Sequence, residues 1–324
     1  MDAVIGLIDA TRGWLFEQAV LPVLYGLGLM ALAEPAYESL DVVMLGVGQM
    51  AIAFALFRPL ERWRPVEAWR DRRAVRVDVL YTVLERLGVI SLLFFFTLRP
   101  LVDGLDGVAR RAGYIPPNLE DMLPAGVGGH IAAFAVYLLV LDLADYLYHR
   151  LQHRWDTWWA LHSVHHSQRQ LSFWADDRNH VLDSLLREAV LATLALLIGV
   201  PGRQFVLIVF VTKLVESLSH ANVQFSFGPL GERLLVSPHY HRIHHGIGVG
   251  HEGPARGCNF AALFPVWDIL FGTARFLPIY PPTGIRGDTL VDYGSGFWDQ
   301  QFKALGRLGR VWRPAGLEPS GRPS

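Results

Sequence analysis

The sequence predicts an all-α fold in which four to six membrane helices form a bundle and a helical cap holds a histidine-rich site for two metal ions. Its composition indicates a membrane protein, because 52% of the 324 residues are hydrophobic and 18% are charged, whereas about 25% of a soluble domain is charged. Long apolar stretches supply the candidate membrane segments. Thirteen histidines are present, and eight of them fall into three short boxes. This clustering predicts the metal site.

Six apolar stretches are candidate membrane segments: roughly 19–33, 40–57, 80–98, 130–147, 185–200 and 205–218. A helix needs about 20 residues to cross a bilayer, with a working range of about 17 to 25. The first stretch and the last two fall at or below that limit, which gives the count of four to six. Pro201 and Gly202 join the last two stretches and form a turn signal. We therefore expect a tight helical hairpin that only partly penetrates the bilayer.

The arginines predict the orientation of these segments. Seven arginines lie between Arg58 and Arg76, whereas the preceding turn at 34–38 carries two acids and no base. Loops rich in arginine stay in the cytoplasm, so we expect segment 80–98 to leave the cytoplasm and segment 130–147 to return to it. A hairpin that enters and leaves on one side then puts all three boxes, and both termini, on the cytoplasmic side.

The whole chain, 1–324, is expected to form a single domain. Residues 221–324 are rich in Gly and Pro and contain no apolar stretch of spanning length, so we expect them to form the cytoplasmic cap. Beyond Pro281 the composition predicts irregular structure, with 281–324 as a flexible cytoplasmic tail. The N-terminal sequence MDAVIGLIDATRGWLFEQ lacks the basic, apolar and cleavage regions of a signal peptide, so we expect no cleaved leader.

Charge and cysteine content exclude several kinds of partner and site. The net charge is −1, so no overall basic character indicates binding to nucleic acid. The single cysteine, Cys258, cannot form an internal disulfide, a cysteine-based zinc site or an iron–sulfur cluster. Any bound metal must therefore be held mainly by nitrogen and oxygen atoms.

The three boxes are HRLQH, HSVHH and HRIHH, and their histidines are His149, His153, His162, His165, His166, His241, His244 and His245. Residues three and four apart lie above one another on a helix, so each box directs its imidazoles to one side. Imidazole is a good ligand for iron, zinc, copper and nickel. Structural zinc sites use four protein ligands and catalytic zinc sites use three, so eight histidines predict two metal ions. Arg150 replaces the glutamate that a zinc protease needs in the first box.

Two acids precede the first box on the same helix face. Asp142 and Asp145 share that face with His149 and His153, at successive spacings of three, four and four residues. One interpretation is that a carboxylate accepts the far N–H of a metal-bound imidazole and so fixes its orientation. The other is that both carboxylates are solvated at the interface or paired with Arg150 or Arg154. Charged groups at the end of an apolar helix are costly, which favours a role in the site.

The boxes and their surroundings resemble the fatty acid hydroxylase and sterol desaturase superfamily of integral-membrane, non-haem di-iron enzymes. The resemblance covers about residues 57–275. Its most specific parts are LDLADYLYHRLQHRWDTWWALHSVHHS, GPLGERLLVSPHYHRIHHG and CNFAALFPVWDILFGT. The last two parts resemble the bacterial sterol-desaturase-like branch and, within it, alkylglycerol monooxygenases. The resemblance implies that the eight boxed histidines are metal ligands.

The resemblance also implies a ninth ligand, His220, in the sequence SHANVQF. Some members carry a further histidine four residues from that position, where this chain has Glu216. Glu216 then has three alternatives: it ligates a metal, it orients His220, or it pairs with Lys213 one turn earlier. His180, in DDRNH, resembles a recurrent Arg-x-His element and is a further candidate for a role in the site. His130, His239 and His251 are expected to have ordinary structural or surface roles.

The family implies two iron ions, with O2 as co-substrate, and hydroxylation or desaturation of an unactivated C–H bond in a lipid, sterol or fatty-acyl chain. Since the sequence shows no haem, flavin or nicotinamide motif, electrons are expected from a separate ferredoxin-like or cytochrome-like donor. The expected location is the bacterial inner membrane. An ether-lipid monooxygenase of the alkylglycerol type is the alternative enzyme, and a non-catalytic metal- or haem-binding membrane protein is the alternative of another class.

Overall fold

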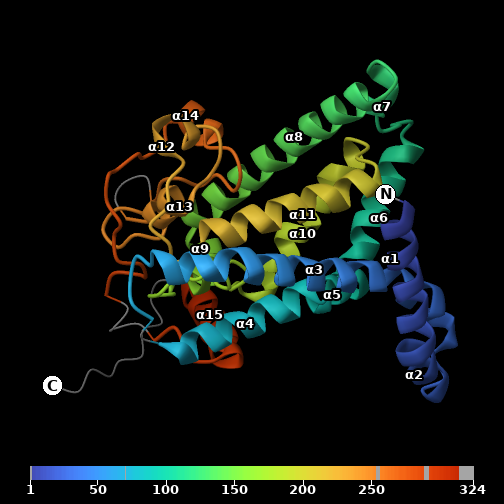
Figure 1. Cartoon of the computed structure of the whole chain (residues 1–324), viewed down its shortest axis with the longest axis horizontal. Helices are drawn as coiled ribbons and strands as arrows, with labels where there is room; N and C mark the ends of the chain where they lie inside the picture. The colour runs from blue at the N-terminus through green and yellow to red at the C-terminus, as the bar shows by residue number, and fades with distance from the viewer. Residues whose placement is uncertain (1, 70, 253–255, 288–291, 314–324) are drawn as a thin grey trace.

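Apart from an isolated bridge between Gly246 and Thr283, helices form all the regular structure in the residues that this computed structural model describes. Those residues are 2–69, 71–252, 256–287 and 292–313. Figure 1 shows long helices that run side by side, with a group of short helices and loops at one end and further short helices at the other. The predicted all-α fold is confirmed.

Two helices are long and apolar enough to cross a membrane: α3, Ala33–Trp63, and α8, Val127–Arg154. A third span is possible if α4, Arg72–Arg86, and α5, Val89–Thr97, act as one segment, although they are bent by 50° relative to each other. Gly88 lies at this bend with a φ of 78°, a conformation that glycine adopts readily. The described residues thus provide two or three spanning candidates by length and composition, and the expected count of four to six stays a prediction.

The two shorter apolar stretches do form a helical hairpin. Its helices are α10, Val181–Leu197, and α11, Gly202–Ser219, and the chain reverses between them at the turn signal. The packing of α10 and α11 against α8 buries Leu141, Ala195 and Ile208 in one apolar cluster. The hairpin therefore brings the C-terminal end of α11 back towards the end of α8, where the first box lies.

The first apolar stretch does not form a single long helix. Instead it is divided among the π-helix Phe16–Val20, α2 at Leu21–Gly26 and the short turn Met30–Leu32. Together with α1, Asp2–Leu15, these elements lie at the end of the long helices opposite the C-terminal part of the chain (Figure 1). The N-terminal helix thus lies at the far end from the boxes. Because the spanning candidates rest on length and composition alone, the location of both termini on the cytoplasmic side stays a prediction.

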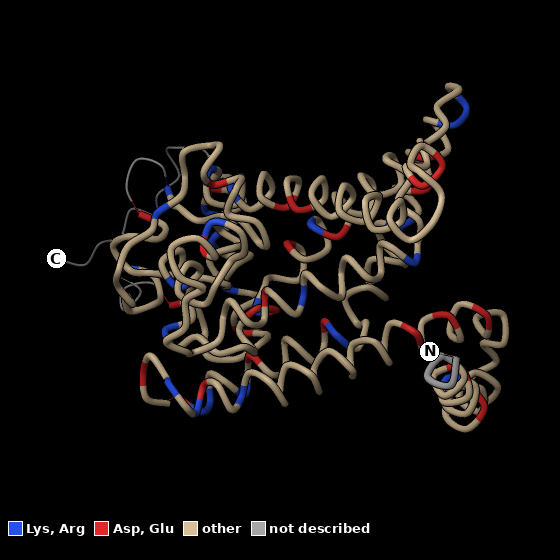
Figure 2. The backbone as a smooth tube through the Cα atoms, turned by 45° about the horizontal axis from the view of Figure 1, so that its top comes forward, with Lys and Arg blue, Asp and Glu red and all other residues tan. Residues whose placement is uncertain are grey.

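The cap consists of short helices joined by long loops at the other end: α9 Asp156–His166, α12 Gly228–Gly231, α13 Pro238–His244, α14 Val266–Leu270 and α15 Phe297–Val311. The helices α6, Arg99–Arg111, and α7, Leu119–Met122, lie at the opposite end with α1. Figure 2 shows charged residues at both ends and also partway along the long helices. Charges in the latter position are costly in a bilayer and indicate a polar interior.

Helix α15 lies within the segment that the composition predicted to be irregular. Ala304 is completely buried against Leu161 and Val164 of α9, and Gln300 and Gln301 form hydrogen bonds with Tyr81. The sequence FWDQQFKALGRLGRV carries apolar residues at helical spacing, and the Gly- and Pro-rich sequence around it concealed that pattern. The expectation of irregular structure was therefore wrong for this part. Residues 288–291 and 314–324 of the expected flexible tail lie outside the described residues.

Helices α3 and α4 touch at a glycine. A Cβ on Gly46 would lie 1.7 Å from the carbonyl oxygen of Arg86, whereas a Cβ on Gly48 would meet nothing within 4 Å. Gly46→Ala is therefore expected to force the helices apart and to lower the free energy of unfolding by about 1–3 kcal/mol. Gly48→Ala is the matched control and should be neutral or stabilising, because alanine favours a helix. Thermal unfolding in detergent would compare the two, and equal stability of both variants would contradict the close contact.

Candidate metal centre

The nine histidines of the predicted site come together where the ends of two long helices meet two helices of the cap. Their positions are the end of α8 (His149, His153), α9 (His162, His165, His166), the C-terminal cap of α11 (His220), and α13 with its C-terminal cap (His241, His244, His245). Eight of the nine are buried and His149 is partly buried. Residues from segments almost a hundred positions apart therefore form one cluster.

Local sequence explains how the boxes are presented. Helix α8 ends at Arg154, and Trp155 adopts an extended conformation that turns the chain into α9. Ser237 caps α13 by accepting a hydrogen bond from the Tyr240 N–H, and Pro238 occupies the first helical position, where its missing N–H costs nothing. The third box therefore begins in a helix that starts only three residues before it.

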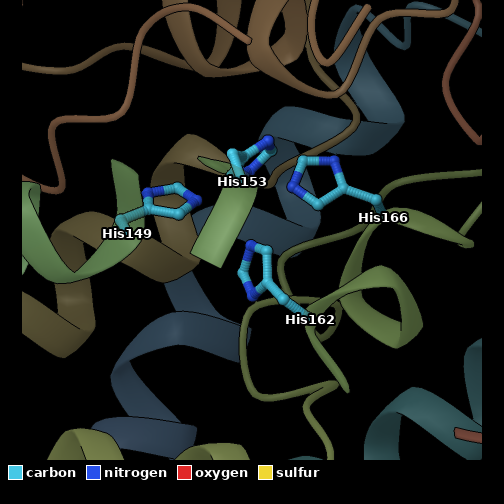
Figure 3. Close-up of side chains that lie close together, drawn as sticks. All are labelled: His149, His153, His162 and His166. Atoms are coloured by element: carbon cyan, nitrogen blue, oxygen red, sulfur yellow. The ribbon is translucent and has the colours of Figure 1, made fainter. Parts of the chain in front are cut away.

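The cluster divides into groups whose ligand atoms all lie within 4.8 Å of one another. The first histidine group contains His149, His153, His162 and His166, and the second contains His165, His220, His241 and His245. A linking group of His166, His244 and His245 shares one residue with each. Figure 3 shows the rings of the first histidine group directed towards a common space. Two adjacent positions for a metal ion are thus present.

Backbone carbonyls hold four of the rings in one orientation. The Nδ1 atoms of His149, His153 and His244 donate to the carbonyl oxygens of Phe260, Arg256 and Cys258, at 2.8, 3.2 and 2.7 Å. The Nδ1 of His220 donates to the Glu216 carbonyl at 2.8 Å. A carbonyl oxygen only accepts, so each neutral ring carries its proton on Nδ1 and keeps the Nε2 lone pair free. The loop 256–260 alone therefore orients three ligands, a function that no motif in the sequence signalled.

Asp183 orients a fifth ring and was also missed from the sequence. Its carboxylate lies 3.3 Å from His162 Nδ1 and accepts hydrogen bonds from the Tyr148 hydroxyl at 3.0 Å and Gln152 Nε2 at 2.7 Å. A carboxylate behind a ligating histidine fixes its tautomer and raises its basicity. The available signal was an acid in the first turn of a largely apolar helix, three residues after His180.

Asp142 and Asp145 have other partners than either interpretation of the sequence predicted. Asp142 accepts from the backbone N–H groups of Leu263 and Phe264, at 2.9 and 3.1 Å, and from Trp267 Nε1 at 2.8 Å. It thus fastens the loop before α14 to α8. Asp145 forms a bidentate ion pair with Arg187. Neither carboxylate forms a hydrogen bond with a histidine among the described residues.

Glu216 and His180 lie outside the three histidine groups. The Glu216 carboxylate pairs with Arg187 at 2.8 Å and Lys213 at 3.4 Å, so pairing with Lys213 is one part of its role. Its backbone carbonyl, and not its carboxylate, orients His220. His180 caps α10, because its Nδ1 accepts from the Leu182 N–H at 3.1 Å. Its role in the fold is therefore structural.

The free nitrogen atoms fit a bound metal. The Nε2 atoms of His149, His153, His162 and His244, and both ring nitrogens of His166, are buried without a hydrogen-bond partner among the described residues. Such unsatisfied groups are rare in proteins and require an explanation. In the second histidine group, His220 Nε2 lies 3.2 Å from His165 Nε2 and 3.1 Å from His241 Nε2. Neighbouring ligands of a metal with bonds of about 2.1 Å are about 3 Å apart, so this spacing suits a shared ion.

Burial keeps these imidazoles neutral. Loss of solvent lowers the pKa of His244 to about 3 and the pKa of His220 to about 4. Burial, followed by the neighbouring imidazoles, also lowers the pKa values of His165, His166 and His245 well below the usual range. A metal binds the neutral ring and must otherwise displace a proton. At neutral pH these ligands therefore require no deprotonation before they bind metal.

We expect Asp183→Ala to lower metal affinity about 10–100-fold, the usual effect of losing the group behind a ligating histidine. Asp183→Asn should have a smaller effect, because its amide oxygen still accepts from His162. Equilibrium competition with a chelator would measure both. Asp103→Ala is the control, since Asp103 is an exposed acid of α6. An Asp183→Ala variant that binds metal as tightly as this control would contradict the orienting role.

Comparison with known proteins identifies relatives of this region. A model of the fatty acid hydroxylase family matches residues 134–273, which include all nine histidines. Ornithine lipid hydroxylase OlsE of Rhizobium tropici is 32% identical over 261 residues, which cover 79% of this chain and 73% of that protein.

Alkylglycerol monooxygenases give shorter matches. The proteins of Danio rerio and Homo sapiens are each 31% identical, over 135 and 138 residues, which cover 42% of this chain and 29% of each relative. No solved structure matches the chain.

Proposed function

The chain belongs to the fatty acid hydroxylase family, and from this premise we propose that it is a membrane oxidoreductase that uses O2 to hydroxylate, or desaturate, an unactivated C–H bond of a lipid. The observation that carries the proposal is the convergence of nine histidines, eight of them buried, into two linked groups of metal-binding geometry. Family membership indicates the class of reaction, and the histidine cluster is the candidate active site.

In this proposal one iron is held by the first histidine group and the other by the second, with His244 directed between them. When bound, the two irons would supply the O2 chemistry that protein side chains cannot perform. The chain itself keeps the ligands ready: the carbonyls of 256–260 and the Asp183 carboxylate hold the Nδ1 protons, which leaves the opposite nitrogens free.

A cavity of about 830 Å³ supports a lipid as the substrate. Its inner end is lined by histidines of both groups, including His149, His162 and His220, and its outer part by apolar residues such as Leu45, Leu191 and Val206. A pocket of this size holds a drug-sized ligand or a larger part of a lipid. Val206 is 47% exposed on an apolar flank, so we propose that the substrate enters from the bilayer.

The relatives suggest two substrate classes. An ornithine lipid is the first candidate, because the match to the ornithine lipid hydroxylase covers most of this chain. An ether lipid is the second, because two alkylglycerol monooxygenases match the part that holds the histidines. In both cases electrons would come from a separate ferredoxin-like or cytochrome-like donor. The proposed location is the bacterial inner membrane, with the cap in the cytoplasm.

Comparative lipid mass spectrometry would test the activity. Cells that express the protein are expected to contain a lipid with one additional oxygen, whereas cells without it should lack that species. A loss of two hydrogens would select desaturation instead, and a lost ether lipid would select ether cleavage. Cells that express a His166→Ala variant provide the inactive control. Identical lipids in all three strains would contradict the proposed function.

A further inference from the structure

The cavity that leads to the histidines is lined by many charged side chains as well as apolar ones. One face of α11 runs along it, with Val206, Phe210, Lys213, Glu216 and His220 at helical spacing. The face is apolar at its outer end, charged in its middle and histidine-bearing at its inner end. The charged layer therefore lies between the metal centre and the apolar part of the cavity.

Most of these charges are already paired with one another. The cations are Arg86, Arg187 and Lys213, and their acidic partners are Asp145, Asp176, Asp177 and Glu216. Each of the three cations contacts two of these acids. The four acids outnumber the three cations, so this layer already carries an excess of negative charge.

Two further carboxylates line the cavity, Glu85 of α4 and Glu188 of α10. Ser91 lies beside them in the cavity lining, and the negative charge of Glu85 acts on Glu188. Within the described part of the chain neither forms an ion pair, since the nearby arginines and lysine are used elsewhere. Carboxylates away from bulk water are normally paired. Lys213 and Arg187 act on this pair only beyond ion-pair distance and already neutralise other acids, so the pair lacks a positive partner of its own.

The position of the pair relates it to the reaction site. Glu188 lies five residues after Asp183, whose carboxylate touches His162, so the two are separated by about 7.5 Å along α10. One turn further along the same helix, Leu191 begins the apolar lining. A positive group bound here would lie between Asp183, which touches His162, and the apolar lining that begins at Leu191.

We propose that Glu85 and Glu188 form a subsite for the ammonium group of a lipid headgroup. The inference rests on the proposed function and specifies which lipids the cavity selects. An ammonium group would neutralise the unpaired carboxylates, and its hydrogen-bond donors would reach both. Neither residue belongs to a group of metal-binding geometry among the described residues, which favours an organic cation over a metal ion as the occupant.

Purified wild-type protein with its metal bound would be tested against three probes by native mass spectrometry in detergent. The probes are an ornithine lipid, the same lipid with its free amine acetylated, and the same lipid with that amine trimethylated. Acetylation removes the positive charge, whereas trimethylation keeps it and controls for added size. We expect the acetylated lipid to bind at least about tenfold more weakly than the free amine, because the partly buried acids lose their partner. The trimethylated lipid should bind more tightly than the acetylated one.

Variants identify the residues responsible. The double substitution of Glu85→Gln and Glu188→Gln should abolish the preference for the free amine. Glu38→Gln, at an exposed acid of α3, should retain it in full. Metal content and the thermal midpoint would show that the double variant is folded. If the double variant fails to fold, the comparison of lipids on wild-type protein still decides the question.

Equal binding of the free-amine and acetylated lipids by wild-type protein would overturn the subsite. So would a folded double variant that keeps the wild-type preference. If wild-type protein oxidises the acetylated lipid as well as the free amine, the subsite fails while lipid oxidation stands. If it holds metal but oxidises none of the lipids, and expressing cells contain no altered lipid, the proposed function itself fails.

Discussion

His166→Ala is expected to remove most of the bound metal and to lower turnover by at least about 100-fold. His166 belongs to both the first histidine group and the linking group, so its loss disturbs both metal positions. Loss of a group that merely orients a ligand costs about 10–100-fold in affinity or activity, and loss of a shared ligand should cost at least as much. Metal analysis and the rate of lipid oxidation would measure the effect on protein purified from membranes.

His130→Ala is the matched control for this prediction. His130 is exposed at the end of α8 opposite the cap and pairs with Glu120. It should leave metal content and turnover unchanged. Membrane insertion should be the same for both variants, because neither changes an apolar stretch. A His166→Ala variant with the metal content and rate of the control would show that the linking group is not part of the metal centre.

Arg86→Met is expected to have the largest effect on stability, a loss of about 3–5 kcal/mol. The Arg86 side chain is 3% exposed and pairs with Asp176 and Asp177, which are 4% and 0% exposed. Removal of one partner from a buried pair leaves uncompensated charges, and this costs more than the pair contributes. Denaturant unfolding in detergent micelles would measure the difference.

Arg110→Met controls for the loss of an arginine as such. The Arg110 side chain is 55% exposed, and its pair with Asp106 spans one turn of α6. Exposed pairs of this kind contribute about 1 kcal/mol or less. Combining Arg86→Met with Asp176→Asn and Asp177→Asn should recover part of the lost stability, since the two carboxylates that Arg86 neutralised are then uncharged. Equal loss in the Arg86 and Arg110 variants would contradict the importance of the buried network.

The positions of the ligands could be predicted from the sequence, but the groups that orient them could not. The spacing of the boxes and a family resemblance identified all nine histidines that the structure brings together. Ring partners depend on which backbone folds over the cluster, and no local pattern encodes the carbonyls of 256–260. Asp142 shares a helix face with His149, yet seven residues place it about 10 Å away along α8. The N–H groups of Leu263 and Phe264 reach it instead.

The sequence predicted the fold class correctly, but it predicted the beginnings and ends of the helices less well. Apolar composition identified α3 and α8 correctly as long helices, because burial in a bilayer needs only length and hydropathy. Gly88 interrupts the apolar stretch of α4 and α5, where a single residue decides whether a helix continues. The helix α15 is stabilised by packing against α9. Such a contact between distant segments could not be predicted from a local sequence rich in Gly and Pro.

Metal analysis of the purified wild-type protein tests the central claim most directly. The account predicts two irons per chain, no absorption band of haem, and loss of both irons in the His166→Ala variant but not in His130→Ala. Folded protein that binds no metal after reconstitution with ferrous iron, or that holds its iron in haem, would contradict the claim that these nine histidines form a di-iron centre.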